Sequence, residues 1–335
     1  MLNFLQYQYL PPNVKEELKN ANVFMSREYA SFINKLNRQY YYFFNEDFIL
    51  PIEIFKKPFH KVGRIYSEVY RRNLDRLDDY SERAFLDDVI NILKTKFKLM
   101  CINQTATTAI LEVIPSNSKY IPFGTYELDL SLEEDTLLNN IHSKHRNSIV
   151  RAERNGVQIR RGQVDLIDDL YYVLSHTYRR SNMFLNEKSY FEDLIRTLNS
   201  QSIIFAAYKD NAVQGAALFF YNSQRCYYMY GGSIDSPEPG AMNLLHWMAI
   251  LYMKRSNVRV YDFVGARLDP DKDSKYYTMQ RFKERFGAQI KEGYMFKCVL
   301  NEFQHNAYTL AKHLVKKKWQ KDIIDQESHK YLNIL

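Results

Sequence analysis

Apolar and polar positions follow two different periods along this chain, and each period predicts one kind of element. Three apolar runs in the second half have the length and the aromatic or β-branched content of strands. These runs cover residues 203–209, 212–221 and 225–230. They are separated by Asp210-Asn211 and Asn222-Ser223, which are residue types that form hairpin turns. The three runs therefore predict antiparallel strands.

The next two segments change the predicted sheet from antiparallel to mixed. Segment 243–254 is apolar on nearly every side, which predicts a buried helix. The run 258–264 after it predicts another strand. A strand–helix–strand crossover within one sheet requires parallel pairing. We therefore expect strand 258–264 to lie parallel to strand 225–230.

The remaining periodic segments give the two halves of the chain a similar order of elements. The predicted helices lie at 13–20, 27–36, 79–97, 166–180 and 188–198, and the predicted strands at 40–44, 48–53, 99–103, 109–113 and 157–161. A chain of 335 residues is too long for one ordinary core. We predict a first domain of residues 1–150 and a second of 151–304. The apolar stripe of a C-terminal helix near 308–321 predicts that segment 305–335 returns to the first domain.

Segment 126–159 combines an apolar helical stripe with a basic face. A short strand, 126–130, leads to Ser131, and Glu134 three residues later completes a capping-box pattern. The apolar positions of the predicted helix are Leu138, Ile141, His145, Ile149 and Ala152. Gly156 predicts its end, because glycine adopts the left-handed conformation of a helix C-cap. The exposed face carries Lys144, Arg151 and Arg154.

The sequence Arg281-Phe-Lys-Glu-Arg-Phe-Gly287 is the most distinctive motif of the chain. A lysine held beside an aromatic ring in a pocket can stabilise an oxyanion or a phosphate, because the neighbouring ring excludes water. In this interpretation Phe282 and Lys283 belong to a functional site. The alternative is a surface strand with basic residues, in which Arg281 and Arg285 point away from Lys283.

Composition and charge favour a globular protein with an anionic partner. The chain has 46 Lys and Arg against 39 Asp and Glu, a net charge of +7, and much of the excess lies in 142–161. Such clusters attract phosphate-bearing molecules, although a solvated helix face is the alternative. No basic and then apolar N-terminus and no run of 18 apolar residues occurs, so we expect a cytoplasmic protein. The three cysteines are widely spaced, which favours reduced thiols.

Three stretches in order resemble the FemABX family of aminoacyltransferases and related GNAT-like acyltransferases. They are 128–157, then Tyr230-Gly-Gly-Ser233 with the helix 243–253, then 261–266 with 281–287. The resemblance covers roughly residues 120–300, and the N-terminal 120 residues match loosely. It implies an α/β fold with mixed sheets, in which two tandem GNAT-like lobes each consist of a sheet flanked by helices.

The resemblance also implies roles for particular residues. Phe282 and Lys283 match the family's aromatic–lysine pair, which places Lys283 against developing charge or a phosphate. Asp262 would deprotonate the attacking amine, although a structural carboxylate bonded to backbone or to Arg146 is the alternative. Further implied substrate contacts are Tyr230 at a strand end, Gly240 at a helix start and Arg281 toward a phosphate. Lys144, Arg151 and Arg154 would bind nucleic acid.

The function that the resemblance implies is transfer of an aminoacyl group from aminoacyl-tRNA to an amino group of a peptidoglycan precursor. A second interpretation is an N-acyltransferase that uses acyl-CoA or acyl-carrier protein on an amino sugar or surface-polysaccharide precursor. A third is a non-catalytic binding protein. The predicted partners are a nucleotide- or lipid-linked cell-envelope precursor, tRNA and the anionic inner face of the membrane. The donor is the sole co-substrate, and we expect no metal because His142 and His145 lack a third ligand.

Two observations bear on the donor. CoA-binding GNAT proteins carry a glycine-rich loop before the helix that starts near residue 241, whereas this chain has Ser-Pro-Glu-Pro-Gly-Ala at 236–241. Glu238 opposes a pyrophosphate there, which favours tRNA over CoA. Many tRNA-using members carry a helical hairpin arm that does not fit between Gly156 and Arg281, which counts mildly against tRNA.

Overall fold

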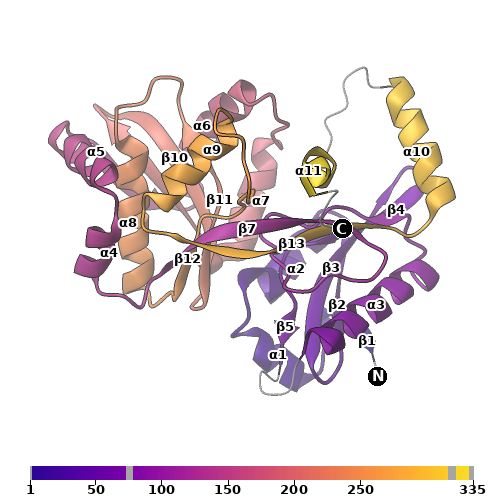
Figure 1. The fold of residues 1–335 in the computed structure, drawn as a ribbon. Helices are drawn as coiled ribbons and strands as arrows, with labels where there is room; N and C mark the ends of the chain where they lie inside the picture. The colour runs from indigo at the N-terminus through magenta and orange to yellow at the C-terminus, as the bar shows by residue number, and fades with distance from the viewer. Residues whose placement is uncertain (1, 73–77, 316–321, 332–335) are drawn as a thin grey trace. The chain divides into compact units, whose positions relative to one another are not determined.

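The computed structural model describes residues 2–72, 78–315 and 322–331 (Figure 1). The chain divides into two compact units. The first comprises Met1–Thr125, Gly265–Leu268 and Glu292–Leu335, and the second Tyr126–Val264 and Asp269–Lys291. This division differs from the predicted one at 150, because helix Ser143–Arg154 packs on a helix of the second unit. The predicted helix end at 316–321 lies outside the described residues.

The first unit contains a mixed sheet with the order β1-β2-β3-β4-β6-β13. Its strands are β1 Asn3–Gln6, β2 Gln39–Phe44, β3 Phe48–Lys57, β4 His60–Ile65, β5 Tyr70–Arg71, β6 Cys101–Ile102 and β13 Gln289–Val299. The pair β4–β6 is parallel, and the other recorded pairs, including β3–β5, are antiparallel. The predicted strand 109–113 was wrong, since only Leu111 forms a bridge, to Tyr294. Strands β4 and β13 were not predicted.

Helices cover both faces of this sheet, because successive side chains of each strand point to opposite faces and both sets are packed against helices or turns. The helices are α1 Pro12–Leu18, α2 Arg27–Lys35, α3 Asp79–Thr95, α10 Glu302–Val315 and α11 Ile323–Tyr331, with short 3-10 turns η1 Tyr7–Tyr9 and η2 Val23–Met25. On one face, Phe43 and Ile52 pack with Leu93 of α3. On the other, the Tyr40 and Tyr42 hydroxyls donate to carbonyls of η2. Both faces are therefore buried.

The second unit also contains a mixed sheet, with the order β7-β12-β11-β10-β9-β8. Its strands are β7 Lys119–Asp129, β8 Gln158–Gly162, β9 Ser202–Lys209, β10 Ala212–Tyr221, β11 Arg225–Ser233 and β12 Val260–Asp262. Among the recorded pairs of these strands, only β11–β12 is parallel, and the others are antiparallel. The predicted parallel pairing after the helix crossover is confirmed. Both central residues of the β9–β10 turn, Asp210 and Asn211, have positive φ, as a tight hairpin requires.

Helices cover both faces of this second sheet. They are α4 Glu134–Asn140, α5 Ser143–Arg154, α6 Ile167–Arg180, α7 Lys188–Leu198, α8 Ala241–Arg255 and α9 Lys275–Glu284, with 3-10 turns η4 Val164–Leu166 and η5 Asn199–Gln201. Helix α8 packs on the face that carries Phe205 and Phe219, and α5 lies beside it (Figure 1). On the other face, Phe191 of α7 contacts Tyr230 edge to face.

The predicted single helix from Ser131 to Gly156 is two helices. The capping box was wrong, because α4 begins after Glu133 and no side chain caps it. Ile141 is extended and ends α4, and His142 caps α5 by accepting the Lys144 amide at Nδ1. The break leaves Leu138 of the predicted apolar stripe 36% exposed. Gly156, with φ +79°, ends α5 as predicted.

Candidate functional site

The centre of the second sheet opens where β11 and β12 separate. Their last paired residues are Tyr227 and Asp262, after which β11 continues alone on that side from Tyr228 to Ser233. A β-bulge between β10 and β11 inserts one residue after Tyr228. Because strand side chains alternate, the extra residue puts Tyr230 on the same face as Tyr227 and Asp262. The recorded pairing of β11 with β12 therefore ends at Asp262, with Tyr227, Tyr230 and Asp262 on one face of the sheet.

Asp262 is held at this opening by a backbone amide and a guanidinium. The Val264 N–H donates to its Oδ1 at 2.7 Å, and Arg225 Nη1 donates to its Oδ2 at 3.0 Å. Arg225 also forms an ion pair with Glu127. The partner anticipated from sequence, Arg146, instead donates to the carbonyls of Asn139 and Ile141 at the end of α4. The Asp262 carboxylate is 3% exposed and rigidly placed.

Lys283 reaches the same place from α9. The segment that we considered as a surface strand is the last turn of this helix, and Gly287, with φ +83°, follows it. Lys283 is 8% exposed, and its Nζ donates to the Val264 carbonyl. Burial lowers the pKa of Lys283 to about 8, and the negative charge of Asp262 opposes this shift. Lys283 therefore combines a buried positive charge with a titration near neutral pH.

The backbone between these two groups has an unusual conformation. Val264 has φ +45°, a region that β-branched residues rarely adopt. This turn directs the Val264 amide to Asp262 and its carbonyl to Lys283. Backbone strain of this kind persists where the surrounding contacts fix it, and it concentrates at functional sites. The turn thus places a carboxylate and an amine around one residue.

The neighbours of Lys283 on α9 face different surroundings. Phe282 packs against His145, His246 and Phe286, with ring centroids 5.1–5.5 Å away. It therefore belongs to the core beneath α5 and α8. Arg281 is partly exposed and forms an ion pair with Glu284 at 2.7 Å. Lys283 of the motif is thus buried, Phe282 is half-buried against the core, and Arg281 is partly exposed.

Two buried histidines lie in this core: His145, which was predicted on the apolar side of its helix, and His246, which was not singled out from the sequence. His246 is fully buried, its Nδ1 lies 2.7 Å from the Tyr261 hydroxyl, and its Nε2 has no partner among the described residues. The Nδ1 of His145 likewise has none. Burial lowers the pKa of His246 to about 3 and that of His145 to about 4, and each histidine's positively charged neighbours add to the shift. Both rings are therefore neutral near pH 7.

These histidines predict a loss of stability in acid. The pKa of His145 is about 4 in the folded chain and about 6.5 unfolded, so its contribution is complete above pH 6.5 and declines as the pH falls toward 4. At pH 5 the loss should be about 2 kcal/mol. His145→Phe should recover this amount in urea unfolding at pH 5 and little at pH 7.5. Equal recovery by the exposed control His329→Phe would contradict this assignment.

Gly240 has a structural explanation that the sequence did not reveal. It precedes α8 with φ +88°, and a Cβ there would lie 2.1 Å from the Ser148 carbonyl oxygen of α5. Its close approach is therefore to a neighbouring helix. Glu238 beside it accepts from Lys209 Nζ at 2.7 Å and from Asn155 Nδ2 at 2.6 Å. This paired carboxylate lies where a phosphate at the start of α8 would be placed.

The basic face of α5 is exposed as predicted from its pattern. Lys144, Arg151 and Arg154 are all exposed. The two arginines line a shallow depression of about 320 Å³ together with Val150. This face is separate from the buried Lys283, and its charges are available to a large anionic partner.

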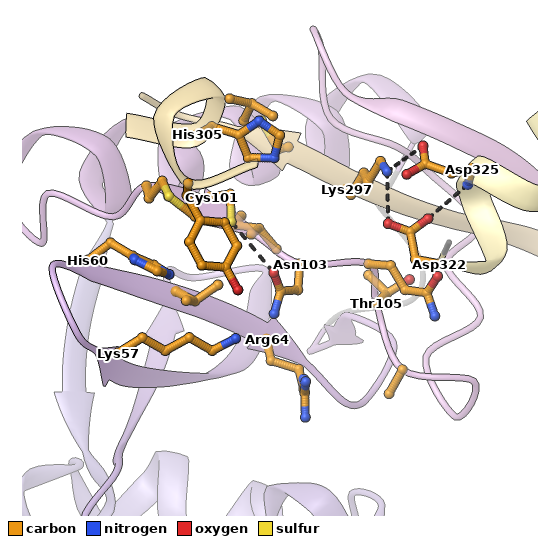
Figure 2. A pocket seen from close by; sticks show the side chains of 18 of the residues that line it. Lys57, His60, Arg64, Cys101, Asn103, Thr105, Lys297, His305, Asp322 and Asp325 are labelled. Atoms are coloured by element: carbon orange, nitrogen blue, oxygen red, sulfur yellow. Dashed lines mark hydrogen bonds and ion pairs between the residues drawn. The ribbon is translucent and has the colours of Figure 1, made fainter. Parts of the chain in front are cut away.

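Sequence reasoning also missed a cavity of about 560 Å³ in the first unit (Figure 2). It lies over β3, β4 and β6, and Lys57, His60 and Arg64 contribute to its wall. Residues two apart on a strand share a face, so Lys57 lies on the same face as Phe55, and His60 on the same face as Val62 and Arg64. This spacing was the sequence signal for the cavity wall. We did not recognise β4 as a strand, so the signal went unused.

Among the described residues no group of three potential ligands could hold a metal ion, and no helix is long and apolar enough to cross a membrane.

Comparison with known sequences matches a segment that lies mostly in the second unit to a protein family. Residues 141–283 match the family described as acetyltransferase (GNAT) domain. The chain is 29% identical over 113 residues to lipid II:glycine glycyltransferase of Staphylococcus aureus, an alignment that covers 33% of this chain and 26% of that protein. The chain thus aligns with about a quarter of the length of this relative.

Comparison with solved structures extends the likeness to both units. FemX superposes with a TM-score of 0.67 and 15% identity over 91% of this chain and 99% of FemX. A tandem GNAT protein from the clavulanic acid biosynthesis pathway gives 0.50 and 11%, over 89% and 98%. These likenesses show the fold, which consists of two tandem GNAT-like units. The predicted fold class is confirmed.

Proposed function

We propose that this chain is a member of the FemABX-like GNAT family and an acyltransferase of peptidoglycan assembly, which the matched GNAT domain, the glycyltransferase relative and the FemX-like fold support. It transfers an aminoacyl group from aminoacyl-tRNA to an amino group of a nucleotide- or lipid-linked cell-wall precursor. The reaction takes place in the cytoplasm at the inner face of the membrane. The observation that carries this proposal is the buried Lys283 beside Asp262 at the opening between β11 and β12.

The proposed chemistry is direct aminolysis of an ester. The acceptor amine attacks the aminoacyl carbonyl, a C–N bond forms, and the ester C–O bond breaks to release the tRNA ribose hydroxyl. Asp262 accepts a proton from the attacking amine, and the departing hydroxyl is protonated in turn. The edge of β11 and the Lys283 ammonium stabilise the negative oxygen of the tetrahedral intermediate. Tyr230, on the same face, contacts the substrate, and Phe282 shields Lys283 from water. No enzyme nucleophile is required.

Two charged features favour a tRNA donor over CoA. The exposed cations Lys144, Arg151 and Arg154 match the backbone of a nucleic acid. Glu238 and the Ser148 carbonyl occupy the start of α8, where free N–H groups would otherwise favour a pyrophosphate. We therefore assign the donor to the α5 face. Arg281, on the solvent side of α9, is a further phosphate contact.

Salt dependence tests the donor. Retention of charged tRNA should weaken steeply as salt is raised, because Lys and Arg contacts to phosphates release counterions. The double reversal Arg151→Glu and Arg154→Glu should weaken binding at least tenfold at low salt and reduce the salt slope. Filter binding at several salt concentrations measures both effects. Reversal of Arg179 and Arg196, which are exposed on α6 and α7 on the opposite face of the second sheet, is the matched control. Unchanged tRNA binding in the α5 double variant would remove this face from the donor site.

A second candidate is an N-acyltransferase that uses acyl-CoA or acyl-carrier protein on an amino sugar or surface-polysaccharide precursor. The observation that favours it is the match of residues 141–283 to an acetyltransferase (GNAT) domain. Isothermal titration separates the two donors. Micromolar CoA affinity without tRNA retention would establish the second candidate, and the absence of binding to either donor class would favour a non-catalytic binding protein.

A further inference from the structure

We propose that one end of the first unit's sheet binds the surface of an anionic lipid bilayer, with Phe59 as the side chain that enters it. This end surrounds the β3–β4 turn, and we call it the turn surface. Its residues are Lys56, Phe59, Lys61, Lys98 and Phe303, which all belong to the first unit. The turn surface would supply the membrane contact of the proposed function, and its binding to vesicles is measured without acyl transfer.

Phe59 occupies a position that water and the backbone both disfavour. It follows Pro58 in the two-residue turn between the paired residues Lys57 and His60. Its side chain is 97% exposed, and its φ is +74°, a region that bulky residues rarely adopt. Glycine or asparagine would adopt this conformation at a lower cost. A strained and exposed aromatic residue at the tip of a hairpin therefore indicates a contact with a partner.

Two lysines flank the tip on the two strands of the hairpin. Lys56 lies directly opposite Lys61 in the antiparallel register. Like charges in this arrangement repel each other and destabilise the hairpin. Both side chains are exposed, and neither forms an ion pair with another described residue. An anionic partner would relieve the repulsion between them.

Backbone hydrogen bonds bring Lys98 and Phe303 to the same end of the sheet. The Met100 N–H donates to the Lys61 carbonyl at 2.9 Å, and the Asn301 N–H donates to the Met100 carbonyl at 3.0 Å. Lys98 comes two residues before Met100, and Phe303 comes two residues after Asn301. Lys98 is exposed, and the Phe303 ring is 84% exposed. A third cation and a second aromatic ring are thus close to the turn.

The turn surface is basic because few acidic residues lie near it. Segments 56–61, 98–101 and 299–303 contain four lysines and one acidic residue, Glu302. Glu53, on the same strand as Lys56, is fully buried and accepts from Arg38 Nη1 at 2.7 Å, so it does not neutralise the exposed lysines. The surface therefore attracts an anionic partner.

The order of these groups along the hairpin matches the depth profile of a membrane interface. Phe59 is at the tip, and Lys56 and Lys61 follow three and two residues behind it. The ring can enter the hydrocarbon while the long lysine side chains reach back to the phosphates. A phenylalanine ring carries no hydrogen-bonding atom, so hydrocarbon satisfies it completely. Each lysine near an anionic bilayer strengthens binding about fivefold.

Vesicle sedimentation of the full chain tests this inference. Vesicles of phosphatidylglycerol and phosphatidylcholine in equal parts should bind the chain at least tenfold more tightly than phosphatidylcholine alone, and added salt should weaken the binding. A chain that binds both kinds of vesicle equally, or neither, would contradict the proposal.

A fluorescent label tests which residue enters the bilayer. The three natural cysteines are buried, so a polarity-sensitive fluorophore can be attached selectively to Phe59→Cys. Its emission should shift to shorter wavelength when anionic vesicles are added, because the label leaves water. The control is the same label on Tyr80→Cys, which is exposed at the opposite end of α3 from Lys98 and should show no shift.

Charge variants separate the turn surface from the basic face of α5. Lys56→Gln with Lys61→Gln should weaken vesicle binding at least tenfold. Arg151→Gln with Arg154→Gln removes the same number of charges and should weaken it far less. The opposite ranking would overturn the proposal. Loss of tRNA retention with unchanged vesicle binding in the lysine variant would also overturn it, and would assign the turn surface to nucleic acid.

Phe59→Gly separates the membrane contact from the stability of the fold. Glycine adopts positive φ freely, so the melting temperature should stay the same or rise. Vesicle affinity should nevertheless fall at least tenfold, because the inserted ring is lost. Acyl transfer to a soluble nucleotide-linked acceptor should be unchanged in this variant, so a failure of membrane binding is distinct from a failure of the proposed reaction. Unchanged vesicle affinity in folded Phe59→Gly would overturn the inference.

Discussion

Replacing Lys283 by alanine should lower turnover at least tenfold while the chain stays folded. The proposed mechanism assigns the buried Lys283 ammonium to the developing charge, and removal of one such donor typically costs 10²–10³-fold in acyl transfer. Lys283→Met removes the charge but keeps most of the side-chain volume, so it should show the same loss. Steady-state kinetics with charged tRNA and a precursor acceptor, together with circular dichroism, measure the two properties.

The pH dependence of turnover distinguishes a catalytic role of Lys283 from a purely structural role. The pKa of Lys283 is about 8, so the ammonium is present below this pH and is lost above it. Turnover of the natural chain should therefore fall as the pH rises through about 8. The residual activity of Lys283→Met should lack this falling limb. Full activity in a folded Lys283→Met variant would remove Lys283 from the mechanism.

Replacing Gly240 by alanine should destabilise the second unit by about 3 kcal/mol. The new Cβ would lie 2.1 Å from the Ser148 carbonyl oxygen, so α5 would have to move away from α8. The positive φ of +88° adds a further cost for any side chain. Urea unfolding monitored by fluorescence measures the loss.

Gly156 provides the matched control, because it has a similar φ of +79° and no atom within 4 Å of an added Cβ. Gly156→Ala should cost only about 1 kcal/mol, from the backbone conformation alone. The difference between the two variants isolates the contact between the helices. Equal losses would show that α5 and α8 are free to separate at this point.

The sequence predicted best those elements whose pattern is local. The meander β9–β10–β11 and helix α8 have long apolar runs and clear turn residues, and their bounds lie within a few residues of the prediction. Strand β13 was not predicted, and its partner β6 lies in a distant part of the chain. Strand β4 was not predicted either, although it forms a hairpin with the preceding strand β3. The capping box at Ser131 matched a local pattern, yet the amide of Ser131 bonds to Asp129 and the helix begins later.

The sequence predicted residues for the candidate site, and it did not predict their geometry. The structure brings Lys283 and Asp262 together around Val264, but the pairing depends on a left-handed valine that no pattern reveals. Arg225 is the partner of Asp262 because the parallel register pairs it with Val260, two residues before Asp262 and on the same face of the sheet. Gly240 was predicted as a contact for the donor, which stays a prediction, and the structure shows that it closely approaches the Ser148 carbonyl of α5.

The first unit is assembled from both ends of the chain, and this has a consequence for biosynthesis. Its sheet includes β13, which pairs with β6, and its core includes Ile324 of α11. A ribosome that has released the N-terminal 125 residues has therefore not yet supplied these parts. The second unit, in contrast, is nearly complete once residue 291 has emerged. Although domains usually fold in N-terminal to C-terminal order, the nascent first unit must remain unfinished until the residues of β13 and α11 have emerged.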